Sequence, residues 1–466
     1  MSLHNLYTAK TEQVTTAALI GVGHFGTAIL AQCYPMSQVK LSAIASLTWE
    51  SMAQAAKTAG IPDDQICFCQ TLEQAKAALE NGQLAAVTDP MLLMDLEIDT
   101  IMEGSGDPEA GAAYCLAALN AGKNVVMVSK EVDSCVGPEL RRIAREKGLI
   151  CTPVDGDQHG ALMQLVEWAR DIGCEIIAAG KSRDAEFIYD RKEKTVTVYC
   201  DQITIPKTIT VHLSDEECEL MESSDPDKVQ ECVRRRKEIL HELDPRGGFD
   251  LCEMVNAANA TGLVPDTSLL HDFILHTPEL PMVLCGPEYG GMLSRSGVIE
   301  VVTNLHERHE AGLGGGEWIV VHCPNAYSQM ILATKGCLNN ADQTVSLVYR
   351  PYHLCGVEAS ATLQCVGITG VSIGGDTAKQ SFDIVQEAVV DLHKGDVMGN
   401  DHDTRMLTHM VPATRMQPDQ PIPAHMLNGK VLACDVPKGT IITYGMVECP
   451  EHSALFDLRR QLEAHL

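Results

Sequence analysis

Three closely spaced glycines mark the first place in this sequence where residue types and spacing could do chemistry. Gly21, Gly23 and Gly26 fit the pattern GxGxxG, with His24 and Phe25 at its variable positions. The pattern follows an apolar run typical of a strand and precedes one typical of a helix. In that context the glycines permit a tight turn, close approach of the backbone to a pyrophosphate, and helix–strand packing. The stretch therefore predicts a dinucleotide site, and a glycine-rich turn without a ligand is the alternative.

The residues after the next predicted strand, 39–45, indicate which dinucleotide would bind. A site for NAD usually has an acidic residue there, which binds the ribose hydroxyls. This sequence has Ser46 and Thr48, and no acidic residue before Glu50. Hydroxyls tolerate a 2′-phosphate that a carboxylate would repel, so we expect NADPH, with Ser46 and Thr48 near its phosphate. Lys57 would add a positive charge only if its helix turned back toward the site.

Predicted strands alternate with predicted helices up to about residue 154, which is typical of a parallel, doubly wound sheet. Among them are a strand over 100–103 and helices over 108–120 and 138–147. Ligands of such sheets bind beyond the carboxyl ends of the strands. We therefore expect the residues that follow three of these strands to lie near the nicotinamide. They are Gly104, Ser105, Gly106, Lys130 and Asp155.

Two lysines at predicted strand ends are candidate catalytic residues. Lys130 follows a strand predicted over 124–128, and Lys181 follows one predicted over 175–179. A lysine beside a nicotinamide can hold a carbonyl oxygen and donate a proton as hydride arrives. A surface salt bridge is the alternative. We assign the catalytic role to Lys130, because its strand end should lie at the cofactor, and also to Lys181.

The stretch TPVDGDQHGALMQ, residues 152–164, places two carboxylates at a strand end. Asp155 and Asp157 could curl around one hard cation such as Mg²⁺ or Mn²⁺, with Asp266 as a third oxygen ligand. Asp157 would then also act in catalysis. The alternative is that Asp157 caps the following helix and that Asp155 closes a turn.

Several polar side chains in glycine- and proline-rich connections are candidates for binding a substrate phosphate. Arginine forks match phosphate oxygens. The alternative for each residue is that it only ties down a loop. The glycine-rich stretch 312–316 is either a lid or a plain surface loop. The candidates are Arg246, His322, Asn325, Arg350 and His353.

Length and composition exclude some classes of protein. The net charge of −28, from 63 acidic and 35 basic residues, repels nucleic acid and anionic membranes. No apolar run approaches the roughly 20 residues of a membrane-spanning helix, and the first residues lack a signal-peptide layout. We expect a cytoplasmic protein whose cysteines are reduced and mostly buried. The run from Arg234 to Arg236 is predicted to be a solvated helix face.

The pattern as a whole predicts an α/β protein with three domains. A Rossmann-type sheet covers 1–154, an α+β substrate and dimerisation domain covers 155–384, and a small β domain covers 385–466. In the last, DLHKG from Asp391 matches DVPKG from Asp435, which suggests internal pseudo-symmetry.

Longer stretches resemble known families. ALIGVGHFG, IDTIMEGSGDPEAGAAYCLAALNAGKNVVMVSKE and the pair Gly180-Lys181 resemble homoserine dehydrogenase, in which a strand-end lysine, here Lys130, lies by the nicotinamide. ACDVPKGTIITYGMV resembles part of a SAF (antifreeze-like, β-clip) domain. The combination resembles the DXR-like proteins, a bacterial group that makes 2-C-methyl-D-erythritol 4-phosphate from 1-deoxy-D-xylulose 5-phosphate with NADPH, for isoprenoid synthesis.

The resemblance implies a homodimeric reductoisomerase for a small phosphorylated sugar. In it Asp155 and Asp157 would hold a divalent cation and Lys130 or Lys181 would supply a proton. The ordinary reductoisomerase has Lys-Glu followed by a PVDSE-type segment, and here PVDGD replaces it. Its later metal-binding motifs are not recognisable. The alternatives are a homoserine-dehydrogenase-like NADP-dependent oxidoreductase for another hydroxy or oxo compound, without rearrangement, and a nucleotide-regulated carbohydrate-binding or sensing protein.

Overall fold

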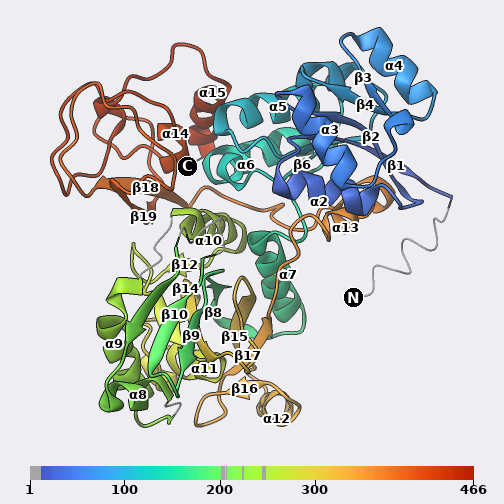
Figure 1. The fold of residues 1–466 in the computed structure, drawn as a ribbon. Helices are drawn as coiled ribbons and strands as arrows, with labels where there is room; N and C mark the ends of the chain where they lie inside the picture. Colours follow the sequence, from blue (N-terminus) through green and yellow to red (C-terminus); the bar gives the residue numbers. More distant parts are fainter. Residues whose placement is uncertain (1–11, 201–204, 206, 223–224, 244–247, 466) are drawn as a thin grey trace. The chain divides into compact units, whose positions relative to one another are not determined.

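The computed structural model describes residues 12–200, 205, 207–222, 225–243 and 248–465. Two compact units divide the chain (Figure 1). The first contains the described residues of 1–160, 354–407 and 412–466, and the second contains those of 161–353 and 408–411. The chain therefore begins in the first unit, builds most of the second, and returns to the first.

The first unit is built on a seven-stranded parallel sheet with the order β3-β4-β2-β1-β5-β6-β7. The strand order reverses between β1 and β5, which is the point where doubly wound sheets bind ligands. The predicted α/β fold class is confirmed. The strands are β1 (Thr15–Ile20), β2 (Val39–Ala45), β3 (Ile66–Phe68), β4 (Leu84–Val87), β5 (Thr100–Glu103), β6 (Asn124–Met127) and β7 (Cys151–Pro153).

Helices cover both faces of this sheet. Side chains alternate along β1, so Ala17 and Leu19 join the core under α2, α3 and α13, whereas Ala18 and Ile20 join the core under α4, α5 and α6. Strands buried on both faces explain the near-continuous apolar runs in the sequence. The helices are α2 (His24–Cys33), α3 (Trp49–Thr58), α4 (Leu72–Glu80), α5 (Pro108–Asn120), α6 (Lys130–Glu146) and α13 (Ala359–Gln364).

Helix α6 differs from the helix that the sequence predicts over 138–147. It begins at Lys130 and contains Pro138 in its interior. Proline has no N–H to donate to the carbonyl four residues earlier. The side chain of Gln380 donates to that carbonyl, Ser134 O, at 2.8 Å. A side chain from a distant segment thus replaces the missing hydrogen bond and lets the helix start earlier.

The C-terminal segment, except residues 408–411, folds as part of the first unit. It shares the hydrophobic core of α5 and α6, and the buried Arg459 guanidinium binds both carboxylate oxygens of Asp383, at 2.9 and 2.6 Å. The backbone N–H of Ala454 donates to Glu109 of α5 at 2.8 Å. Its elements are β18 (Phe382–Ala388), β19 (Met406–Pro412), α14 (Ala424–Leu427) and α15 (Ala454–Leu462).

The two similar pentapeptides of this segment contact each other reciprocally. The Asp391 carboxylate of the first accepts a hydrogen bond from the backbone N–H of Lys438 in the second, at 2.8 Å. The Asp435 carboxylate of the second accepts one from the N–H of Lys394 in the first, also at 2.8 Å. The two pentapeptides are thus related by a local two-fold symmetry, as their repeated sequence suggests.

The second unit is built on a mixed sheet with the order β11-β10-β9-β14-β8-β15-β17-β16, in which β12 and β13 also pair with β14. Its strands are β8 (Glu175–Ser182), β9 (Phe187–Asp190), β10 (Thr195–Val198), β11 (Ile209–His212), β12 (Val264–Pro265), β13 (Phe273–Leu275), β14 (Val298–Glu307), β15 (Glu317–His322), β16 (Leu338–Asn339) and β17 (Ser346–Arg350). Its helices are α7 (Gln158–Asp171), α8 (Asp215–Glu222), α9 (Val229–Ile239), α10 (Gly248–Thr261), α11 (Leu280–Val283) and α12 (Ala326–Thr334).

The arginine run of α9 corrects one expectation. Arg234 and Arg235 are exposed, but Arg236 is fully buried and binds the buried Glu279 carboxylate at 2.6 and 3.0 Å. Three consecutive helical residues point about 100° apart, so they cannot all face solvent on a helix that packs against a sheet. A buried guanidinium needs such a bidentate partner.

Two further observations concern the chain as a whole. Among the described helices, none has the length and apolar character to cross a bilayer. No disulfide links the described cysteines, and most of them are buried, which agrees with their expected behaviour as small apolar residues.

Candidate functional site

The glycine motif forms a cradle at the point where the strand order of the first sheet reverses. Gly21 has φ +91°, and a Cβ atom there would lie 2.0 Å from the carbonyl oxygen of Gly104. A Cβ atom on Gly26 would lie 2.1 Å from the oxygen of Gly21. At Gly23, in contrast, no described atom lies within 4 Å of such a Cβ. Tight packing on two sides and open space on the third fit a pyrophosphate lying against the backbone at Gly23.

Helix α2 opens directly from this cradle. His24, which is exposed, and the partly buried Phe25 are its first two residues, and its N-cap is Gly23. Among the described residues, no side chain caps this end. Its first N–H groups and the positive end of the helix dipole are therefore available to an anion.

Hydroxyl groups gather at the end of β2, as the sequence predicts. Ser51 Oγ donates to Ser46 Oγ at 2.9 Å, and Thr48 caps α3 by accepting from the N–H of Ser51 at 3.2 Å. Lys57 does not join them. It lies in the last turn of α3, about 13 Å along the helix axis from Thr48 at 1.5 Å per residue, and so points to a different part of the surface.

The loops after β5 and β6 converge beside the glycine cradle. The backbone N–H of Gly106 donates to Ser129 Oγ at 3.0 Å. The N–H of Ser105 donates to the buried Glu103 carboxylate at 2.8 Å, and burial raises the pKa of that carboxyl. Ser129 is the N-cap of α6, so Lys130, partly buried, lies at the same edge of the sheet as the cradle.

Asp157 lies directly before helix α7 and caps its N-terminus. Its carboxylate accepts the N–H of Gln158, the first residue of α7, at 2.8 Å, and lies 3.7 Å from His159. Burial acts to raise the pKa of Asp157, but His159 and Lys130 outweigh it and hold the pKa well below its usual range. The carboxylate is thus ionised near Lys130, and the capping alternative describes its contacts.

The predicted metal centre is not supported. Asp155 accepts a hydrogen bond from Thr362 Oγ1 at 3.3 Å, and Asp266 accepts from His271 Nε2 and from the N–H of Ser294, at 2.8 and 3.0 Å. Across the described ranges, no three His, Cys, Asp or Glu side chains are grouped so that they could hold a metal ion. These carboxylates therefore do not fit a cation site together.

A row of charges crosses the sheet of the second unit. In the strand register, Lys181 of β8 lies opposite Glu317 of β15, and Glu317 lies opposite Arg350 of β17. Directly opposed residues share a face of the sheet, so Glu317 lies between two basic side chains. The sequence places Lys181 after its strand. The strand instead continues to Ser182, because Gly180 leaves room for the backbone of Glu300 to approach.

Lys181 is completely buried and bound by two carboxylates. Its Nζ lies 2.8 Å from Asp250 Oδ1 and also bonds Glu253, while Arg183 binds the other oxygen of Asp250. Both acids stand on α10, three residues apart and therefore on one face of the helix. Sequence reasoning missed them, although two acids at this spacing in an apolar helix were a usable signal.

Glu317 is the second residue that sequence reasoning missed. It is fully buried, and neither carboxylate oxygen has a hydrogen-bond partner among the described residues. Burial raises its pKa to about 9, against the opposing effects of Arg350 and Lys181. Glu317 is therefore a neutral acid near pH 7. A glutamate in the apolar strand EWIVVH was the signal for it.

The glycine-rich stretch 312–316 is fastened to its surroundings. Glu186 Oε1 accepts the N–H groups of Leu313 and Gly314 at 2.8 and 2.7 Å, and the oxygen of Gly315 lies 2.8 Å from His353 Nδ1. Such contacts fix the loop and favour the plain-loop interpretation over a lid. His353 is also 3.9 Å from Asp184, whose pKa is raised by burial.

The candidate phosphate-binding residues separate into two groups. Arg350 and His353 lie with the Lys181 row, and the Arg350 guanidinium stacks 4.7 Å above the ring of Tyr352. His322 and Asn325 lie at and beyond the opposite end of β15, about 17 Å from Glu317 at 3.3 Å per residue. Asn325 caps α12 there by accepting from Tyr327 and Ser328. Arg246 lies outside the described residues.

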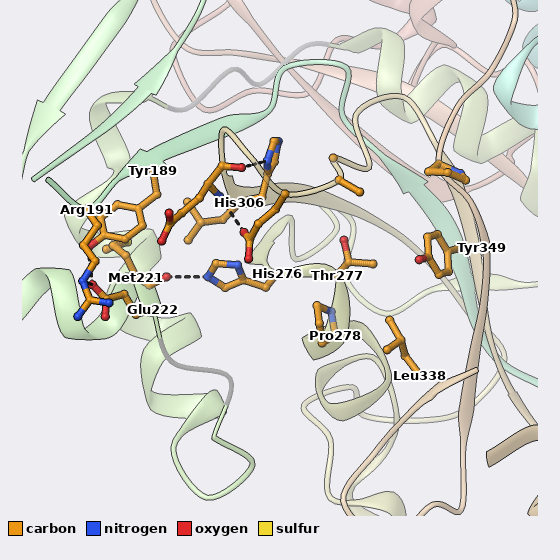
Figure 2. Close-up of a pocket in the computed structure, with 16 residues that line it drawn as sticks. Tyr189, Arg191, Met221, Glu222, His276, Thr277, Pro278, His306, Leu338 and Tyr349 are labelled. Atoms are coloured by element: carbon orange, nitrogen blue, oxygen red, sulfur yellow. Dashed lines mark hydrogen bonds and ion pairs between the residues drawn. The ribbon is translucent and has the colours of Figure 1, made fainter. Parts of the chain in front are cut away.

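A separate pocket of about 580 Å³ opens in the same unit (Figure 2). Tyr189 and Arg191 both bind Glu222 at its rim, at 2.8 and 3.1 Å, and His276 Nε2 lies 2.6 Å from the oxygen of Met221. The predicted catalytic, cofactor-binding, phosphate-binding and metal-binding residues that the structure describes do not line it, whereas Gly312 of the glycine-rich stretch does. Its polar groups are largely engaged with one another.

Comparison with known proteins gives one family match. Residues 244–359 match the family described as oxidoreductase DRL, catalytic domain. The segment includes the buried Asp250, Glu253 and Glu317 and the partly buried Arg350 and His353. The match covers about a quarter of the chain, most of it in the second unit. No curated protein matches the chain.

Solved structures share only parts of the fold. 1-Deoxy-D-xylulose 5-phosphate reductoisomerase from Zymomonas mobilis, in complex with NADPH, is 18% identical with a TM-score of 0.30, over 52% of this chain and 58% of that one. Biliverdin reductase from Synechocystis, with biliverdin and NADP⁺, is 17% identical with a TM-score of 0.25, over 38% and 47%. A mutant of the 3-ketoreductase KijD10 from Actinomadura kijaniata, in complex with TDP-benzene and NADP, has 17% identity and a TM-score of 0.25, over 38% and 48%. The chain spans about half the length of these structures, and likeness at this level says nothing about its substrate.

Proposed function

We propose that this protein is an NADPH-dependent oxidoreductase that reduces a small carbonyl compound. One observation carries the proposal: the glycine cradle, open at Gly23, lies at the same sheet edge as the strand-end Lys130. An open backbone at a helix start suits a pyrophosphate, and a lysine at that edge suits a developing alkoxide. The match of residues 244–359 to an oxidoreductase catalytic domain supports the same conclusion.

The residues of the first unit fit NADPH. The backbone at Gly23 and the start of α2 would bind the pyrophosphate, and the hydroxyls of Ser46 and Thr48 would lie near the 2′-phosphate. When bound, the cofactor supplies a hydride. Lys130 would hold the carbonyl oxygen and donate its Nζ proton to the alkoxide, and Asp157 keeps a negative charge near that ammonium group.

For the substrate we propose 1-deoxy-D-xylulose 5-phosphate, converted to 2-C-methyl-D-erythritol 4-phosphate. The resemblance of the chain to DXR-like proteins supports this choice. Arg350 and His353 would bind the phosphate, since a guanidinium and an imidazole are suitable donors to it. Because Asp155, Asp157 and Asp266 do not fit a common cation site, no step is assigned to a metal ion.

The contacts of these three carboxylates favour a second candidate. If they serve only as caps and hydrogen-bond acceptors, the chain reduces a different oxo compound with NADPH, or oxidises a hydroxy compound with NADP⁺, without rearranging the carbon skeleton.

The two candidates are separated by one assay. Purified protein is mixed with NADPH and 1-deoxy-D-xylulose 5-phosphate, absorbance at the NADPH band is followed, and the product is identified by mass spectrometry. The branched polyol phosphate supports the first candidate. A straight-chain alcohol from this or another carbonyl compound supports the second. Tight NADPH binding without oxidation by any member of a carbonyl panel would overturn both.

A further inference from the structure

The C-terminal segment brings two charged side chains to the first turn of α6. His425 of α14 is buried, with 2% of its surface exposed, and its Nδ1 lies 2.9 Å from Ser134 Oγ. Its Nε2 lies 3.4 Å from Asp401 Oδ2. Ser134 stands four residues after Lys130, so the two residues lie on the same face of the helix.

This histidine connects a helix turn to a carboxylate. The Ser134 hydroxyl that faces its Nδ1 also lies 2.8 Å from the backbone oxygen of Glu131. Its Nε2 faces the Asp401 carboxylate. His425 is thus held between the start of α6 and Asp401.

Four charged groups then surround the start of α6. Burial acts to raise the pKa of Asp401, but the hydrogen bond and charge of His425, with smaller effects of His402 and Lys130, hold it below its usual value. Burial raises the pKa of Glu131, against opposing effects of His425 and Lys130. Asp401 and His425 are therefore close enough to Lys130 and Glu131 for their charges to interact.

We infer that His425 and Asp401 are positioning residues, which hold the first turn of α6 and its Lys130 at the sheet edge where the nicotinamide would bind. This inference rests on the proposed function. It makes the C-terminal segment a structural part of the reductase site, whereas a separate sensing module would have no charged groups next to Lys130. Ser134 links the two parts, because it touches His425 and the backbone of Glu131 at once.

The first test separates positioning from binding. Asp401→Asn keeps the shape of the side chain but removes its charge, and Asp401→Glu keeps the charge. We expect Asp401→Asn to lower kcat about 10- to 100-fold, since displacing a reacting group by about 1 Å has this effect, while the Kd for NADPH changes less than twofold. Asp401→Glu should recover part of kcat. His393→Asn, at a histidine whose side chain is 77% exposed in the same segment, is the matched control and should behave as the wild type.

The second test needs no catalytic activity. The rate at which an amine-selective acylating reagent modifies Lys130 is measured by mass spectrometry in the wild type, Asp401→Asn and His425→Asn. We expect at least a threefold change at Lys130 and none at Lys57. Thermal unfolding identifies any variant that does not fold. If His425→Asn does not fold, the comparison of Asp401→Asn with the wild type decides whether the inference holds. Equal rates in folded variants would overturn the inference even if the protein proves to be a reductase. A changed rate in a protein without reductase activity would disprove only the proposed function.

Discussion

Lys130 and Lys181 look alike in the sequence and differ in the fold. Each comes at the end of an apolar run and next to a small residue. Lys130 starts a helix at the edge of the first sheet and remains partly exposed. Lys181 lies inside a strand of the second sheet with none of its surface exposed, bound by Asp250 and Glu253. Lys130 is partly exposed near Asp157, whereas Lys181 is fully enclosed between two carboxylates.

The difference shows what decides the role of a charged residue. A buried ammonium group is stable only with carboxylates against it, so Lys181 contributes to the order of its unit through a network that includes Arg183 and Glu317. An ammonium group at a sheet edge keeps its hydration and can exchange water for a substrate oxygen. Substitution of Lys130 should therefore lower turnover, whereas substitution of Lys181 should lower the stability of the fold.

The largest effect is expected at Lys130. Lys130→Ala should lower kcat by about 10²- to 10⁴-fold, the usual contribution of a general acid, and leave the Kd for NADPH unchanged. Steady-state kinetics with NADPH fluorescence titration measure both values. Lys57→Ala, at the far end of α3, serves as the control. Normal turnover in the Lys130 variant would contradict its catalytic role.

At Lys181 we expect a loss of stability. Lys181→Met leaves buried carboxylates without their counter-charge, and the free energy of unfolding should fall by about 3–5 kcal/mol. Urea titration followed by circular dichroism gives this value. Lys192→Met, at a side chain that is 90% exposed, should change stability by less than about 0.5 kcal/mol. Unchanged stability with lost turnover would instead make Lys181 catalytic, as the sequence suggests.

Substitutions at two glycines of the cradle should affect different properties, one the stability of the fold and the other the affinity for the cofactor. Gly21→Ala forces a Cβ atom to 2.0 Å from a backbone oxygen at positive φ, and should destabilise the protein by about 1–3 kcal/mol. Gly23→Ala meets open space, so stability should hold while the Kd for NADPH rises about tenfold. Thermal unfolding and isothermal calorimetry compare the two. Equal NADPH affinity in Gly23→Ala and wild type would argue against a pyrophosphate at this position.

Glu317 should make stability depend on pH. Its folded pKa of about 9 lies above the value of about 4.3 expected for an unfolded chain. Between these values the folded state binds the proton, so the contribution of Glu317 to stability falls as pH rises. Relative to wild type, Glu317→Gln should gain on the order of 1 kcal/mol per pH unit between pH 6 and pH 9. Chemical unfolding at several pH values measures the difference, with the exposed Glu216→Gln as control. A constant difference would mean that Glu317 is already ionised.

The smallest effect concerns the choice of cofactor. Ser46→Asp places a carboxylate at the end of β2, where it would repel a 2′-phosphate and bind ribose hydroxyls. We expect the ratio of NADPH to NADH affinity to fall about tenfold, measured by fluorescence titration. Ser46→Ala should change the ratio much less, because it adds no charge. An unaltered ratio in the aspartate variant would place the adenosine ribose elsewhere.

Local patterns predicted the first unit well. The bounds of β2, β5 and α5 agree with the predicted ones, because apolar runs ended by glycine or an N-cap residue are local signals. The start of α6 was missed, since Pro138 looks like a helix start and its compensation by Gln380 comes from a distant segment. The metal site was expected because two nearby acids resemble ligands, and only the fold shows that each has another partner.

The sequence by itself determined the parallel sheet, the open glycine at position 23 and the lysine at the end of a neighbouring strand, because turn geometry and hydrophobic periodicity act over a few residues. Tertiary structure decided which charges meet. Asp250 and Glu253 neutralise Lys181, and Asp401 with His425 lies against the start of α6. Coulomb energy and desolvation depend on distance through space and on burial, and neither can be read from positions along the chain.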